Sequence, residues 1–241
     1  MDISFSQNLK TLERFDSLYQ YFFRRYELEK SDITFKAHRF TLMSIKNVDQ
    51  LLDELIEQGP ESEGVKDERL PYWAEIWPSS IALAEYILQS SENFQGLSAL
   101  ELGCGAGLAG MAAALQGAEV LVSDYQSDAL RLTELNWLLN LGKSPSSILL
   151  DWRQADLDQK FDLIIAADVV YEKRFIEPLI VLFEKLLNVG GKILLSEPNR
   201  KIVLDFFSEL TNHRFAYEKA EMITTCKQKL YHISIYSICK K

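Results

Sequence analysis

A glycine-rich segment of the chain contains the residue types that bind an anionic or nucleotide-like ligand. Residues 99–110 read Ala-Leu-Glu-Leu-Gly-Cys-Gly-Ala-Gly-Leu-Ala-Gly, an apolar run with an acid followed by glycines at alternate positions. This order predicts a strand, a tight turn and the N-terminus of a helix. Because glycine has no Cβ, the turn can approach a ligand closely, and the free N–H groups and dipole of the helix favour a negative group there.

The spacing of the glycines fits two kinds of cofactor. Residues 105–110 satisfy the G-x-G-x-x-G pattern of dinucleotide-binding proteins, in which the first glycine directly follows the strand. Here the predicted strand already ends at Gly103, so the better register is acid-x-G-x-G-x-G, from Glu101 to Gly107. A tight structural turn without a ligand is a third alternative, because one glycine loop is weak evidence by itself.

Acids follow the next two predicted strands. The apolar run at 118–124 ends in Asp124, about twenty residues beyond the glycines, where an acid can accept both ribose hydroxyls of an adenosine. The run at 147–150 is followed by Asp151 and Trp152, so that a carboxylate can meet the adenine amino group and an indole can cover the ring. The alternatives are a helix N-cap for Asp124 and an ordinary core position for Trp152.

The fourth predicted strand, residues 161–167, is apolar almost throughout, and Asp168 and Tyr171 follow it. Parallel strands that are covered on both faces have this composition, and the residues at their carboxyl ends lie in the ligand crevice. We therefore expect Asp168 and Tyr171 at the reactive end of the cofactor, beside Ala167. The alternative for Asp168 is a cap of the next predicted helix, which includes Phe175–Leu187.

An aromatic segment precedes the glycine loop. Residues 70–80 contain Trp73 and Trp77 beside prolines, directly before a helix predicted over 80–89. Two tryptophans are too apolar to be left in solvent, so they either pack in the core or line a site.

Together these motifs resemble those of the seven-strand (class I) S-adenosylmethionine-dependent methyltransferases, and in particular their protein-lysine methyltransferase-like branch. The resemblance covers the chain from about Ile33 to the C-terminus. It rests on the glycine loop, the tryptophan segment, the Asp-Trp pair and the Asp-x-x-Tyr sequence. The DNA, RNA and glutamine amino-methyltransferases have Asn/Asp-Pro-Pro-Tyr at this last position, but here Val169 and Val170 replace both prolines. A flipped base or a carboxamide is therefore not the expected acceptor.

The resemblance implies an activity and a set of site residues. The expected reaction uses S-adenosylmethionine, leaves S-adenosylhomocysteine and methylates a protein lysine. A small-molecule N- or O-methyltransferase and a non-catalytic cofactor-binding module are the alternatives. The implied active-site pair is Asp168 and Tyr171, and the implied cofactor contacts are Trp77, Glu101, Gly103, Gly105, Gly107, Asp124, Asp151, Trp152 and Ala167.

Composition limits the partners. The net charge of -9 disfavours nucleic acid, because phosphate contacts require clustered Lys and Arg, and favours basic proteins or amines. The cysteines at 104, 226 and 239 and the three separated histidines predict neither a disulfide framework nor a metal site. No apolar run is long enough to suggest a transmembrane or signal segment, so we expect a cytoplasmic protein without membrane contact.

Alternating strands and helices predict an α/β fold, a Rossmann-like doubly wound seven-stranded mixed sheet with the last strand antiparallel. We expect a methyltransferase domain at 65–241, preceded by an N-terminal helical and β extension at 1–64 that packs on it. The predicted parts of the extension are an amphipathic helix at 6–29 with an aromatic face, a strand segment at 33–45, a helix at 48–58 and a hinge at 59–64.

Overall fold

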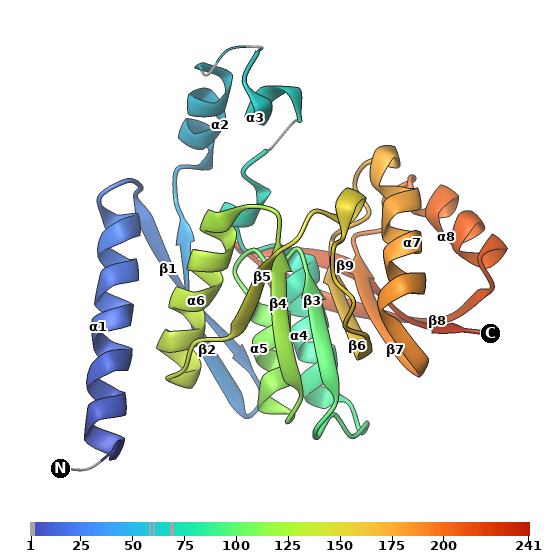
Figure 1. Ribbon diagram of the computed structural model, residues 1–241, viewed down its shortest axis with the longest axis horizontal. Coiled ribbons are helices and arrows are strands. Elements are labelled where there is room, and N and C mark those ends of the chain that lie inside the picture. Colours follow the sequence, from blue (N-terminus) through green and yellow to red (C-terminus); the bar gives the residue numbers. More distant parts are fainter. Residues whose placement is uncertain (1–2, 58, 60, 68–69) are drawn as a thin grey trace.

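The computed structural model describes residues 3–57, 59, 61–67 and 70–241. A seven-stranded sheet in the order β5-β4-β3-β6-β7-β9-β8 forms its centre (Figure 1). All its strands are parallel except β9, which pairs antiparallel with both β7 and β8. The predicted fold is therefore confirmed. The strands are β3 (Ser98–Leu102), β4 (Glu119–Asp124), β5 (Ser146–Leu149), β6 (Phe161–Ala167), β7 (Leu187–Glu197), β8 (Phe215–Cys226) and β9 (Lys229–Lys240).

Helices cover both faces of this sheet, as alternation along the buried strands requires. Leu163 and Ile165 of β6 pack in one apolar cluster with α4 and α5, while Ile164 and Ala166 pack in another with α7 and α8. Figure 1 shows α7 and α8 together on one side of the molecule, away from α6. The helices are α4 (Pro78–Gln89), α5 (Leu108–Leu115), α6 (Ser127–Leu141), α7 (Ile176–Leu186) and α8 (Val203–Asn212).

The N-terminal part of the chain lies beside α6. It consists of α1 (Ile3–Phe23), the hairpin of β1 (Leu28–Phe35) and β2 (His38–Ile45), α2 (Val48–Glu57) and α3 (Glu63–Lys66). Asn136 of α6 is fully buried: its Oδ1 accepts the backbone N–H of Met43 at 2.7 Å, and its Nδ2 donates to the Met43 carbonyl at 3.1 Å. Tyr21 and Tyr26 both donate to the Asp128 carboxylate of α6.

The predicted end of the first helix is wrong, because the helix predicted to reach residue 29 ends at Phe23. The strand character predicted at 33–45 is confirmed, but the hairpin begins earlier, at Leu28. Strand β1 pairs with β2 along its whole length, and this pairing outweighs the helical pattern of residues 24–29. Phe23 lies within the predicted aromatic face of the helix, but it is 60% exposed, whereas Leu18 and Phe22 are buried.

The segment predicted as a hinge contains the start of α3 at Glu63, and its residue 60 lies outside the described residues, as does residue 58 of the helix predicted at 48–58. Within the part of the chain that the structure describes, no helix combines the length and the apolar character needed to cross a membrane.

The contacts of Asn136 lead to a stability prediction. Asn136→Ala removes the side chain that satisfies both backbone groups of Met43, so we expect the free energy of unfolding to fall by about 2–4 kcal/mol. Urea unfolding followed by circular dichroism measures this. Asn212→Ala is the control, because its amide bonds only the exposed Glu209 carboxylate, and we expect little change. Equal stability of the two variants would contradict the role of Asn136.

Candidate cofactor-binding and active site

One cavity lies at the carboxyl ends of β3, β4, β5 and β6, and it has a volume of about 1070 Å³ including the part that opens to solvent. Ten of the eleven predicted site residues line it, and the exception is Asp168. The sheet topology explains this convergence, because adjacent parallel strands end at the same edge. Those ten are Trp77, Glu101, Gly103, Gly105, Gly107, Asp124, Asp151, Trp152, Ala167 and Tyr171.

The glycine loop connects β3 to α5 through left-handed backbone. Gly107, the residue before α5, has φ 77°, and a Cβ there would lie 2.6 Å from Cγ2 of Thr133. Only glycine fits without a shift of α6, which carries Thr133. The Thr133 hydroxyl also donates to the carbonyl of Gly105 at 2.8 Å, so α6 holds the loop from behind.

Two buried carboxyl groups hold the loop from the strand side. Glu101 Oε1 accepts the N–H of Gly110 at 2.9 Å, and Asp124 accepts the N–H groups of Gly105 at 3.3 Å and Gln126 at 3.0 Å. Burial raises the pKa of Glu101 to about 8 and that of Asp124 to about 6. Glu101 Oε2 is buried without a hydrogen-bond partner among the described residues. In their ionised forms these two carboxyl groups offer acceptor oxygens, and a ligand that carries donor groups favours that ionisation.

Asp124 partly fulfils its alternative role, which is to cap the helix that follows. Helix α6 begins at Ser127 with Gln126 as its N-cap, and Asp124 accepts the Gln126 N–H just before it. The same carboxylate lines the cavity, so the support of the helix approach and a ligand contact are compatible.

Asp151 and Trp152 lie at another side of the cavity, directly after β5. Trp152 is half-buried, its ring stands edge-on to Phe175 at 5.5 Å, and a Cβ on Gly103 would lie 3.2 Å from it. Trp152 fits both alternatives, because it packs against a buried apolar cluster and also lines the cavity beside the glycine loop. The Asp151 carboxylate is engaged by Arg153, and these hydrogen bonds lower its pKa.

Aromatic rings form a third wall. Tyr72 stands edge-on to both Trp77, at 5.8 Å, and Tyr171, at 5.4 Å. Burial raises the pKa of Tyr171. Trp73 meets both alternatives for the tryptophans, because it packs on Phe22 of α1 at a ring distance of 6.5 Å and also lines the cavity.

Asp168 is not among the residues that line the cavity, although its neighbours Ala167 and Val169 are. Its backbone is left-handed with φ 59°, its carboxylate forms an ion pair with Arg200, and the Ser79 hydroxyl lies 3.4 Å from Oδ2. A cap of α7 is a wrong interpretation of this residue, because that helix begins at Ile176 with Phe175 as its N-cap.

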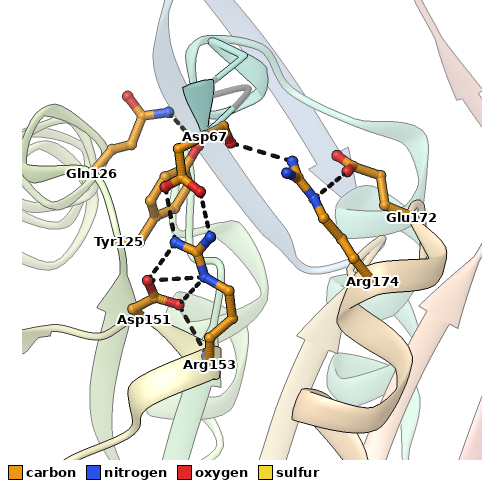
Figure 2. A network of polar contacts seen from close by, with 7 residues as sticks. All are labelled: Asp67, Tyr125, Gln126, Asp151, Arg153, Glu172 and Arg174. Atoms are coloured by element: carbon orange, nitrogen blue, oxygen red, sulfur yellow. Dashed lines mark hydrogen bonds and ion pairs between the residues drawn. The ribbon is translucent and has the colours of Figure 1, made fainter. Parts of the chain in front are cut away.

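Several charged residues of the site were not predicted. Arg153 binds both Asp151 and Asp67, and Arg174 contacts Glu172 and the backbone of Asp67 (Figure 2). Asp67 and Arg153 are 86 positions apart, so no local sequence pattern links them. The only available signal is the position of Arg153 beside the predicted Asp-Trp pair.

The fold and the site together define a Rossmann-like, class I type of methyltransferase. Residues 67–213 match the protein family described as lysine methyltransferase, and the chain belongs to that family. The resemblance predicted from the motifs is thus confirmed, and so is S-adenosylmethionine, rather than a dinucleotide, as the cofactor.

Protein relatives come from several organisms. The chain is 32% identical over 149 residues to the electron transfer flavoprotein beta subunit lysine methyltransferase of Danio rerio, covering 61% of this chain and 57% of the relative. It is 33% identical to the calmodulin-lysine N-methyltransferase of Arabidopsis thaliana, covering 54% and 47%. It is 32% identical to the histidine protein methyltransferase 1 homolog of Dictyostelium discoideum, covering 50% and 41%. The match thus spans about half the length of these relatives.

Solved structures share the fold. The ribosomal protein L11 methylase of Lactobacillus delbrueckii subsp. bulgaricus aligns with a TM-score of 0.53 and 22% identity, covering 68% of this chain and 78% of the other. The 16S rRNA N2 G1207 methyltransferase of T. Thermophilus, solved in complex with AdoMet and guanosine, gives 0.59 and 15%, covering 89% and 51%.

Binding of S-adenosylhomocysteine should depend on pH through Asp124. A carboxylate accepts two ribose hydroxyls only when ionised, and the pKa of Asp124 lies near 6, so acid must weaken binding. We expect protonation of Asp124 to lower the affinity about tenfold from about pH 7.5 to about pH 5, and protonation of Glu101, whose pKa is raised to about 8, to add to this loss in the wild type and in the variant alike. Calorimetry on the wild type and on Asp124→Asn measures this, and the variant should bind weakly with a flatter profile over this range. An equally steep loss in both proteins would assign the proton to another group.

Proposed function

We propose that the protein transfers a methyl group from S-adenosylmethionine to the side-chain amine of a lysine in a protein substrate. The observation that carries this proposal is the single cavity that places acceptor carboxylates, Glu101 and Asp124, together with the aromatic group of Tyr72, Trp77 and Tyr171. The names of the relatives support a protein lysine as the acceptor.

The proposed cofactor contacts follow from the donors and acceptors of the site. Asp124 accepts the ribose hydroxyls, the orphan oxygen of Glu101 accepts from the ammonium of the methionine portion, and Asp151 with Trp152 binds the adenine. Gly103, Gly105 and Gly107 allow the loop to approach the ligand. Trp77 and Ala167 border the reactive end. Bound in this way, S-adenosylmethionine supplies an electrophilic methyl group beside a sulfonium.

The residues around the reactive end then have to orient an amine and exclude water. A lysine amine, with an ordinary pKa of about 10.4, must be neutral to attack, and an aromatic, weakly hydrated wall favours the neutral form. Tyr171 is the proposed catalytic residue that touches the acceptor. Because the Asp168 carboxylate is bound by Arg200 and Ser79, we assign Asp168 the role of positioning the cavity wall between Ala167 and Tyr171.

We further propose that residues 1–64 form an extension that packs on a methyltransferase domain at 65–241. The contacts of Tyr21, Tyr26 and the β2 backbone with α6 support this division.

A labelling experiment tests the reaction. The protein is incubated with methyl-labelled S-adenosylmethionine and a cell lysate, before and after removal of small molecules. Label in protein bands, recovered as methyl-lysine after hydrolysis, supports the proposal. Label that appears only in the small-molecule fraction favours a small-molecule methyltransferase, and binding without transfer favours a non-catalytic module. Recovery of methyl-histidine would instead identify a histidine as the acceptor, as in the name of the Dictyostelium relative.

Variants at the end of β6 test the roles of Asp168 and Tyr171. Asp168→Asn weakens the ion pair with Arg200, and we expect the turnover number to fall about 100-fold while the Kd for S-adenosylhomocysteine changes little. Tyr171→Phe keeps the ring and should cost less. Asp168→Glu is the conservative control and should recover part of the loss. A loss of cofactor affinity as large as the loss of turnover would show that Asp168 serves only the fold.

A further inference from the structure

Two carboxylates bind the same guanidinium at the side of the cavity where Asp151 lies. Both Nη atoms of Arg153 bind the Asp67 carboxylate, while Nη2 also donates to Asp151 Oδ2 at 2.6 Å and Nε to Oδ1 at 2.9 Å (Figure 2). All three residues line the cavity, next to Trp152. Arg153 keeps its charge at any ordinary pH, so its guanidinium remains a donor to whichever carboxylate it binds.

The acceptor capacity of Asp151 is already in use. A carboxylate has about four lone-pair positions. Oδ1 accepts the backbone N–H of Arg153 at 2.9 Å as well as Nε, and Oδ2 accepts Nη2 and, at 3.1 Å, Nε again. A ligand that donates to Asp151 must therefore replace part of its contact with Arg153. Asp67 then provides the anion on which the guanidinium stays.

Asp67 is held in place independently of its side chain. Its backbone carbonyl accepts Nη2 of Arg174 at 3.2 Å, and Nε of Arg174 lies 2.6 Å from Glu172. A substitution that changes only the carboxylate of Asp67 leaves this anchor intact. The charge of Asp67 can thus be tested separately from its position.

We propose that Asp67 determines the specificity of the site for the base of the cofactor, because it keeps Arg153 bound when the base replaces part of the Arg153 contact with Asp151. This inference rests on the proposed placement of adenine at Asp151 and Trp152. With Arg153 drawn to Asp67, the base edge meets a carboxylate acceptor, which pairs with the 6-amino group of adenine. Without Asp67, the same edge meets the guanidinium, a donor that pairs with the 6-oxo group of hypoxanthine.

The test compares S-adenosylhomocysteine with S-inosylhomocysteine, which differ only on this edge of the base: the 6-amino group becomes a 6-oxo group, and N1 changes from an acceptor to an N–H donor. Calorimetry on the full chain gives the ratio of their Kd values, and the wild type should prefer the adenine compound. In Asp67→Asn we expect the ratio to fall on the order of tenfold, the size of one charge-assisted hydrogen bond. Arg153→Gln in the Asp67→Asn background removes the competing donor, so the ratio should return to the wild-type value.

Matched controls separate specificity from folding. Asp32→Asn breaks a comparable ion pair with Arg39 in the β1–β2 hairpin, outside the cavity, and should leave the ratio unchanged. Asp67→Glu keeps the charge and should keep the preference. Thermal melts of each variant confirm folding. If Asp67→Asn is unstable, Arg153→Gln alone provides a second test, and this variant should prefer the adenine compound at least as strongly as the wild type.

The outcomes distinguish this inference from the proposed function. An Asp67→Asn protein that loses affinity for both compounds equally, or keeps the wild-type ratio, overturns the role of Asp67 and leaves the cofactor site standing. A wild type that binds both compounds equally overturns the inference together with the adenine placement. A wild type that binds neither overturns the proposed cofactor site itself.

Discussion

Two buried carboxyl groups, Glu101 and Asp124, hold the glycine loop, and the site depends on this arrangement. They end or nearly end neighbouring parallel strands, β3 and β4, and each accepts backbone N–H groups from the loop or the first turn of α5. Burial of two acids side by side is unfavourable, which is why both pKa values are raised. The backbone donors offset part of this cost, and ligand donors such as hydroxyl or ammonium groups would offset more. The fold thereby places hydrogen-bond acceptors where the proposed cofactor has donor groups.

The loop is also supported from the opposite side, through α6. Thr133 donates to the Gly105 carbonyl, and one turn further on Asn136 donates to the carbonyl of Ala106. Asn136 is the same residue that satisfies the backbone of Met43 in β2. The N-terminal hairpin, α6 and the glycine loop thus form one continuous set of buried polar contacts. Such networks are stable only when every member is satisfied, so a change in the hairpin should reach the site through α6.

Local patterns in the sequence predict the strands and the residues at their ends, but they do not predict which distant residues pair. Apolar runs that end in an acid identify the strands and the residues at their carboxyl ends, because burial and the strand edge act on neighbouring positions. Only the last part of strand β1 lies in the segment predicted as strand, because the stability of β1 comes from pairing with β2, and its own sequence, Leu-Glu-Lys-Ser-Asp-Ile-Thr-Phe, is mostly polar. The Asp67–Arg153 pair and the Asp168–Arg200 pair were missed because their partners are distant along the chain, and charge alone does not identify a partner.

The Asp-x-x-Tyr sequence contributes both to the lining of the cavity and to an ion pair between neighbouring segments. At the end of β6 the backbone is left-handed at Asp168, and Val169 and Tyr171 line the cavity while Asp168 does not. The Asp168 carboxylate contacts Arg200, which follows β7, and Ser79, in the first turn of α4. Ser196 of β7 reinforces this junction, because it accepts the Asp168 N–H and donates to the Ser79 carbonyl. The acid therefore connects the segment that carries Tyr171 to the one that carries Trp77, and this connection is the basis of the positioning role proposed for Asp168.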